Sequence, residues 1–123
     1  LDAQQKSIEK INILMSQSSN IPASQIDRAA RDYIIAKGYK TIPHSVGHGI
    51  GIDIHETPHL SPKSRDILKE GMVFSIEPGI YLPAEASAKV GIPAGGVRIE
   101  DLVVLEKSGP RLLTRSPREL TMV

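Results

Sequence analysis

All four histidines of the chain lie between positions 44 and 59, at His44, His48, His55 and His59. Imidazole nitrogens bind metal ions or carry protons near neutral pH, so the cluster could form a metal site or a proton-transfer site. Glycine stands on both sides of His48, which lets the backbone approach other groups closely and leaves the ring free of neighbouring side chains. A tight turn with surface histidines would show the same pattern. The cluster alone leaves both readings open.

Two carboxylates favour the metal site. Glu77 ends an apolar run immediately before Pro78, and Glu100 stands between Ile99 and the apolar run that follows Asp101. A buried carboxylate is costly unless it is paired or bound to a cation, and hard divalent metals accept carboxylate and imidazole together. Either glutamate alone would fit a solvated strand face, but that reading weakens beside the histidine cluster. The chain has no cysteine, so histidine and carboxylates must supply any metal ligands.

Two motifs in the same stretch are misleading. Residues 55–59 match the H-E-x-x-H pattern of zinc peptidases, which requires both histidines on one face of a helix. Pro58 would break that helix, and the preceding alternation of isoleucines predicts a strand. The glycines at 47, 49 and 51 lack the Lys-Ser or Lys-Thr of a phosphate-binding loop. We reject both motifs.

Two amphipathic helices are expected at the start of the chain. Residues 1–16 contain no glycine or proline. Ser24 and Asp27 form a helix start signal, and Gly38 suits a left-handed C-terminal cap. The apolar stripes at helical spacing are Ile8, Ile11, Leu14 and Met15 in the first helix and Ile26, Ala29, Ala30, Tyr33 and Ile34 in the second.

Strands are expected after residue 43. Alternation predicts them at 50–55, at 72–77 before the Pro78-Gly79 stop, and at 97–105 with Arg98 and Glu100 on one face. Residues 83–96 are rich in Ala, Gly and Pro and suit a loop or an irregular hairpin connection. Helices followed by strands predict an α+β fold, with two helices covering one face of a curved, mostly antiparallel sheet.

Composition limits the classes of function. The chain is 40% hydrophobic and 24% charged, which is typical of a soluble domain with one core. Its formal charge of +1 provides no basic field for nucleic acid, so no nucleic-acid partner is expected. No apolar run approaches the roughly 18 residues that span a bilayer, and the N-terminal residues lack a signal-peptide pattern. We therefore expect a cytoplasmic protein without a membrane partner.

Three segments resemble successive signatures of the pita-bread metallopeptidases, in the order that the family shows. They are residues 44–58, 71–81 and 96–104, and residues 24–38 resemble the helix that precedes them. The family includes Xaa-Pro dipeptidase (prolidase), aminopeptidase P, methionine aminopeptidase and creatinase. The resemblance is nearest to the first two, and it implies the pita-bread fold.

The resemblance also assigns roles to the site residues. It implies that His48, Glu77 and Glu100 are metal ligands, with Glu100 bridging two divalent ions, and that Glu77 also serves catalysis as a proton acceptor. Manganese or cobalt is expected, and zinc would also suit. His55 would contact the substrate and stabilise the transition state, while His44 and Arg98 would contact substrate. The expected substrate is a short proline-containing peptide.

Two ligands of the family's five are absent from the chain. The resemblance places two aspartates on a hairpin upstream of Leu1, so residues 1–123 are expected to be the C-terminal portion of a catalytic domain, without the N-terminal domain. Asp2, Asp27 and Asp32 fall in helical sequence and do not replace them. We predict that the isolated chain binds metal weakly, is inactive, and exposes apolar surface that the upstream half would cover.

The predicted activity of the parent protein is that of a metal-dependent Xaa-Pro dipeptidase, which hydrolyses the bond before proline with a water activated by two metals. Aminopeptidase P is the alternative, and the residues present do not choose between the two. Methionine aminopeptidase fits less well, because His44 and the 83–96 segment suit the proline-specific branch. A non-catalytic, protein-binding relative is the alternative from another class. The parent is expected to be a homodimer, by analogy with the family.

Overall fold

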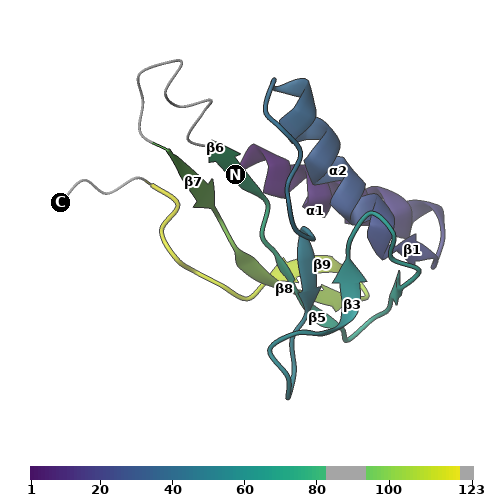
Figure 1. The fold of residues 1–123 in the computed structure, drawn as a ribbon. Helices are drawn as coiled ribbons and strands as arrows, with labels where there is room; N and C mark the ends of the chain where they lie inside the picture. Colours follow the sequence, from purple (N-terminus) through teal and green to yellow (C-terminus); the bar gives the residue numbers. More distant parts are fainter. Residues whose placement is uncertain (83–93, 120–123) are drawn as a thin grey trace.

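Two helices lie side by side against a layer of antiparallel strands (Figure 1). The computed structural model describes residues 1–82 and 94–119. Its helices are α1 (Asp2–Gln17) and α2 (Ala23–Ala36). Its strands are β1 (Ile21–Pro22), β2 (Gly47–Gly49), β3 (Glu56–Leu60), β4 (Ile67–Leu68), β5 (Val73–Ile76), β6 (Gly79–Leu82), β7 (Gly95–Arg98), β8 (Asp101–Glu106) and β9 (Gly109–Leu112). The predicted α+β class with an antiparallel sheet is confirmed.

Helix α1 buries the predicted apolar face and two polar side chains besides. Ile11 and Leu14 enter the core, and Gln4 and Ser7 are also buried. The amide nitrogen of Gln4 donates to the carbonyl of Ile76 over 2.9 Å, and the hydroxyl of Ser7 donates to Ile26 over 2.9 Å. These bonds satisfy the hydroxyl of Ser7 and the amide nitrogen of Gln4, while Oε1 of Gln4 is buried without a hydrogen-bond partner. Within the described residues, neither helix is long and apolar enough to cross a membrane.

Helix α2 confirms the predicted end and corrects the predicted start. Gly38 has φ +85°, the left-handed conformation expected of a glycine just after a helix. At the other end the cap position is Pro22, and no side chain caps the helix. The helix therefore begins one residue before Ser24, close to the predicted start, but the predicted capping contact is absent, because Asp27 is buried and pairs with Arg31 instead.

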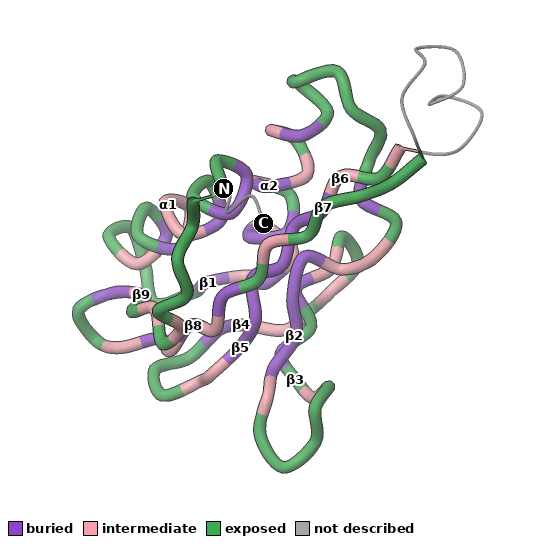
Figure 2. The backbone as a smooth tube through the Cα atoms, turned by 90° about the vertical axis from the view of Figure 1, so that its left-hand side faces the viewer, coloured by how far each residue is buried: buried purple, intermediate pink, exposed green. Residues whose placement is uncertain are grey.

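The main sheet has five strands in the order β3-β2-β5-β8-β9. Helix α1 contacts edge strand β9 and helix α2 contacts edge strand β3, so the helix pair spans the sheet from one edge to the other. A single cluster of buried apolar residues fills the space between the layers, as expected (Figure 2). Its largest members are Phe74, Ile11, Ile26, Leu60, Leu68, Ile76 and Leu105.

The strand predicted at 50–55 is a loop, and this prediction was wrong. The strands on either side of it are β2 and β3, which pair through His48 and His59 with a register shift between His48 and Gly49. The alternating Ile52 and Ile54 are exposed by 104% and 71%, so their alternation reflects no buried face. Gly47 and Gly49 lie in β2 instead. Glycine is required at position 47 by close backbone contact, because a Cβ there would lie 2.0 Å from the carbonyl oxygen of Ser75.

The strand predicted at 97–105 is two strands. Strand β7 ends at Arg98 and β8 begins at Asp101, so Glu100 lies between strands rather than within one. The strand predicted at 72–77 is confirmed as β5, but Gly79 does not end the extended chain: it begins β6, which pairs with β7. Residues 95 and 96 of the predicted 83–96 loop belong to β7, and residues 83–93 lie outside the described residues.

Candidate metal centre

His48 and Glu77 meet at the centre of the main sheet. His48 is the middle residue of β2, and Glu77 directly follows β5, the neighbouring strand. The Nε2 atom of His48 lies 3.1 Å from Oε1 of Glu77, and each residue is only 8% exposed. An imidazole nitrogen and a carboxylate oxygen at this separation, shielded from water, form a donor pair suited to a divalent transition metal.

The backbone around the pair is held by several bonds. The N–H of Glu77 donates to the carbonyl of Val46 over 2.6 Å, and Nδ1 of His48 lies 2.9 Å from the carbonyl of Gly49. A metal-binding histidine usually bonds through its other ring nitrogen in this way, which sets the orientation of the ring. With Nδ1 engaged, Nε2 is the nitrogen left to face Glu77.

Ser75 joins the two donors and was not foreseen as a site residue. Its Oγ accepts the N–H of His48 over 3.1 Å and lies 3.2 Å from Oε1 of Glu77. The hydroxyl is completely buried. The sequence carries one signal for it, because residues two apart in a strand share a face. Ser75 is therefore the polar neighbour of Glu77 that strand geometry predicts.

His55 and Arg98 border the pair. The rings of His55 and His48 have centroids 4.3 Å apart with a 56° angle between planes, although His55 lies in the exposed loop after β2. The Nε atom of Arg98 lies 3.5 Å from Oε2 of Glu77, and the Arg98 side chain is half exposed. Two of the predicted substrate-contacting residues thus stand next to the predicted metal ligands.

His44 is placed at a second contact. Its Nε2 lies 2.7 Å from the hydroxyl of Tyr81 on β6, and its Nδ1 lies 2.7 Å from the carbonyl of Ser45. The two rings meet edge to face with centroids 5.5 Å apart. Tyr81 is a further residue that the sequence motifs did not single out, since a tyrosine on an alternating strand has no distinctive signal.

Glu100 does not join the other two predicted ligands. It is exposed in the link between β7 and β8. Within residues 1–82 and 94–119, no three His, Asp or Glu side chains gather so that they could hold a metal ion. The His48–Glu77 pair fits a divalent metal in donor type and burial, but two donors are too few for a closed site. A metal ion bound by this pair would need further ligands.

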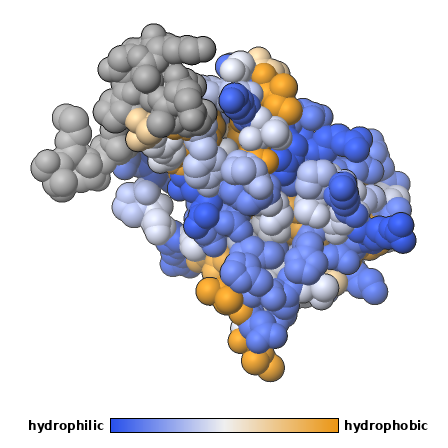
Figure 3. All heavy atoms as spheres, in the orientation of Figure 1, coloured by the Kyte–Doolittle hydropathy of each residue, from blue (hydrophilic) through white to orange (hydrophobic). Residues whose placement is uncertain are grey.

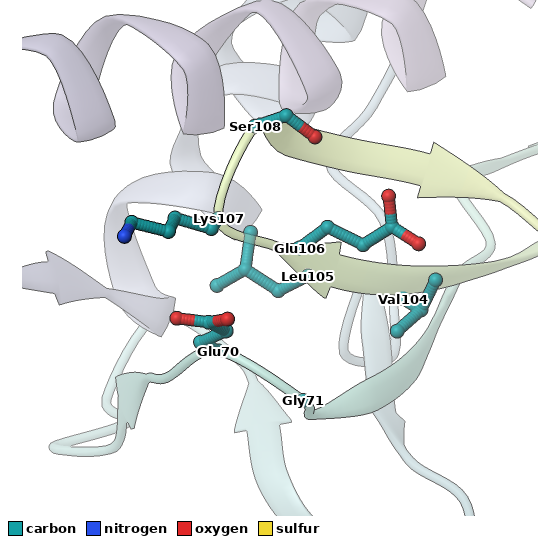
Figure 4. A pocket seen from close by; sticks show the side chains of 7 residues that line it. All are labelled: Glu70, Gly71, Val104, Leu105, Glu106, Lys107 and Ser108. Atoms are coloured by element: carbon teal, nitrogen blue, oxygen red, sulfur yellow. The ribbon is translucent and has the colours of Figure 1, made fainter.

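The candidate centre is separate from the surface hollow shown in Figure 4. That hollow has a volume of about 590 Å³ and lies between the turn before β5 and the β8–β9 hairpin. Its lining is Glu70, Gly71, Val104, Leu105, Glu106, Lys107 and Ser108. None of the predicted site residues lines it.

Comparison with known proteins identifies the family. The model of metallopeptidase family M24 matches residues 1–107. The Xaa-Pro dipeptidase of Pyrococcus horikoshii is 41% identical over 121 residues, which cover 98% of this chain and 30% of that protein. The chain thus spans about 30% of the length of this relative.

Solved structures agree in fold. The Xaa-Pro dipeptidase from Bacillus anthracis superposes with a TM-score of 0.80 at 37% identity, over 99% of this chain and 30% of that one. The X-Pro aminopeptidase from Thermotoga maritima gives a TM-score of 0.77 at 35% identity, over 96% of this chain and 30% of that one. The resemblance to pita-bread metallopeptidases and the predicted fold are both confirmed. The chain belongs to the metallopeptidase family M24.

Proposed function

We propose that the protein to which this chain belongs is a metal-dependent Xaa-Pro dipeptidase, and that residues 1–123 are the C-terminal portion of its catalytic domain. The observation that carries the proposal is the buried contact between His48 and Glu77, 3.1 Å apart at the centre of the sheet. Its support from outside the chain is the 41% identity to an Xaa-Pro dipeptidase.

In this proposal, His48, Glu77 and Glu100 hold the metal with two ligands from outside the described residues. Two divalent cations, manganese or cobalt by preference and zinc as a further possibility, would polarise the scissile carbonyl and acidify the attacking water. Glu77 accepts the proton of that water on a carboxylate oxygen. Glu100, which is exposed in the link between β7 and β8, would have to approach Glu77 in the complete site.

The remaining residues bind the peptide. His55, whose ring lies next to that of His48, donates to the carbonyl oxygen of the scissile bond as negative charge develops there. Arg98 faces Glu77 and is half exposed, so its guanidinium can bind both that carboxylate and the carboxylate of a dipeptide. His44, whose ring bonds to the hydroxyl of Tyr81, would contact the peptide as well. Together they select a short proline-containing peptide, and the protein acts as a homodimer in the cytoplasm.

Aminopeptidase P is the second candidate. The TM-score of 0.77 to an X-Pro aminopeptidase is close to the 0.80 of the dipeptidase match. Both activities cut before proline and differ in the length of peptide admitted. A non-catalytic protein-binding relative is the third candidate, and the retention of His48 and Glu77 as a buried pair speaks against it.

The test is release of free proline from Xaa-Pro dipeptides by the full protein with added manganese. We expect release in the wild type and a loss of about 100-fold or more in Glu77→Gln, which keeps the shape of the side chain but removes its charge. Glu106→Gln is the matched control, since Glu106 pairs with Arg111 on the exposed β8–β9 hairpin. Cleavage of longer peptides only would assign aminopeptidase P. An inactive, metal-free protein would favour the non-catalytic protein-binding relative.

A further inference from the structure

A buried ion pair on α2 lies outside the roles assigned so far. Asp27 is completely buried, and Arg31 binds it with two parallel bonds, from Nε to Oδ2 and from Nη2 to Oδ1, each of 2.8 Å. The bond to Asp27 raises the pKa of Arg31 above its ordinary value. Because the pKa is raised in the folded state, the pair contributes stability that is present below the unfolded pKa of arginine.

The pair forms hydrogen bonds to residues 41–46, which lie between α2 and β2 and form no helix or strand. Arg31 donates to one side of this segment and Asp27 accepts from the other. The contacts are Arg31 Nη1 to Thr41 Oγ1 at 2.9 Å, Arg31 Nη1 to the Ile42 carbonyl, Arg31 Nη2 to the His44 carbonyl at 2.9 Å, and the Val46 N–H to Asp27 Oδ1 at 3.1 Å. The backbone of His44 is held through its own carbonyl, and residues on both sides of it, Ile42 and Val46, are also held.

His48 does not depend on these bonds. It lies in β2, where pairing with β3 and β5 and the bond to Ser75 hold its backbone. His44, by contrast, has no strand pairing, so the bonds from α2 set its backbone position. Arg31 bonds to the carbonyl of His44 itself, whereas the ion pair is linked to Glu77 only through Val46, whose N–H also donates to the carbonyl of Leu60 and whose carbonyl accepts the N–H of Glu77.

We propose that Asp27 and Arg31 are a positioning pair for His44. By fixing the 41–46 backbone they set the distance from the His44 ring to the centre formed by His48 and Glu77. The inference rests on the proposed function, because it assigns the pair to peptide binding and not to metal binding. It also explains why the residue is arginine: five donors in a planar fork reach the carboxylate and two carbonyls at once, whereas a lysine is a single point charge.

The test is Arg31→Lys in the full protein, with three readouts. We expect KM for an Xaa-Pro dipeptide to rise about 10- to 100-fold, as displacement of a binding group does. Manganese affinity should stay within about twofold of the wild type, since His48 and Glu77 keep their own supports. In protein with labelled histidine, the NMR signals of the His44 ring should shift while those of His48 stay in place.

Two controls separate positioning from stability. Arg111→Lys alters an exposed pair with Glu106, 2.6 Å apart, and should change none of the readouts. Leu14→Ala removes a buried side chain of α1 and should lower Tm without raising KM. If Arg31→Lys does not fold, Thr41→Val removes one contact from an exposed residue and should give a smaller rise in KM, of about threefold, since only one solvent-exposed hydrogen bond is lost.

Unchanged KM and unchanged His44 signals in Arg31→Lys would overturn the inference. Manganese affinity and Tm falling together, with no separate effect on KM, would also overturn it and leave the pair a merely structural feature. If the wild type releases no proline, the proposed function fails by itself. The His44 and His48 signals would then still decide whether Arg31 positions His44.

Discussion

The backbone N–H of His48 donates to the hydroxyl oxygen of Ser75 over 3.1 Å, across the boundary between β2 and β5. The same oxygen lies 3.2 Å from the carboxylate of Glu77. One buried hydroxyl therefore connects the two donors of the candidate centre. Removal of this hydroxyl should therefore lower both the free energy of unfolding and the metal affinity.

Ser75→Ala should lower the free energy of unfolding by about 1–3 kcal/mol, because the buried N–H of His48 loses its partner. Manganese affinity should fall in the same variant, since the hydroxyl no longer orients His48 and Glu77. Urea unfolding and metal titration of the full protein measure the two effects. Ser7→Ala is the control: its hydroxyl is equally buried but bonds to Ile26. Equal metal affinities in the two variants would refute the role of Ser75.

Gly47→Ala should prevent the sheet from forming correctly. The added Cβ would lie 2.0 Å from the carbonyl oxygen of Ser75, and a backbone atom cannot move aside as a flexible side chain can. We expect a loss of at least about 3 kcal/mol, the upper range for overpacking. Gly95→Ala is the matched control, because a Cβ there meets nothing within 4 Å. Thermal unfolding of both variants should show a large drop in Tm for the first and almost none for the second.

Metal binding should stabilise the full protein and not the isolated chain. Manganese at about 100 times its Kd should add about 2.7 kcal/mol to the free energy of unfolding, by mass action on the folded state. Chelation with EDTA should remove this increment. His48→Asn should abolish it, whereas His59→Asn should not, because His59 is an exposed residue of β3. A similar rise in Tm for the isolated chain would show that these residues suffice for tight binding.

Ile52→Ser should reduce self-association without affecting stability. Ile52 is fully exposed in the loop between β2 and β3, and Figure 3 shows hydrophobic surface at the lower tip, where Figure 1 places that loop. Replacing an exposed side chain changes stability by no more than about 0.5 kcal/mol. Light scattering at rising protein concentration measures the association. Ile26→Ser, at a completely buried position of α2, should instead cost several degrees of Tm; unchanged association in Ile52→Ser would show that the loop is not the cause.

The sequence predicted the helices better than the strands. Helical spacing of Ile11, Leu14, Ile26 and Ile34 corresponds to burial on one face, since each of these side chains is buried in the core. The alternation of Ile52 and Ile54 had no such cause, because the strands next to them are built from glycines and from Pro58. Strand propensity scales reflect how side chains pack. They do not predict β2, because close backbone contact holds that strand in place.

The sequence indicated some residues of the candidate site and missed others. The histidine cluster and the carboxylate after an apolar run indicated His48 and Glu77, which the structure brings together, and the resemblance to the family indicated His55 and Arg98, which lie beside them. Neither indicated the roles of Ser75 and of the Asp27–Arg31 pair, because the bonds that join Ser75 to His48 and Arg31 to His44 connect segments remote in sequence. Asp27 fits two sequence patterns, a helix start signal with Ser24 and an ion pair with Arg31 four residues later. The structure shows the ion pair.

The β6–β7 hairpin leaves the main sheet directly after Glu77 and returns directly before Asp101. Four residue pairs, from Val73↔Val104 to Ile76↔Asp101, set the register of β5 against β8 at the base of this excursion. Residues inserted or deleted between β6 and β7 therefore need not shift that register. In evolutionary terms, a lineage can lengthen or shorten the chain between β6 and β7 while the sheet that carries His48 and Glu77 stays the same.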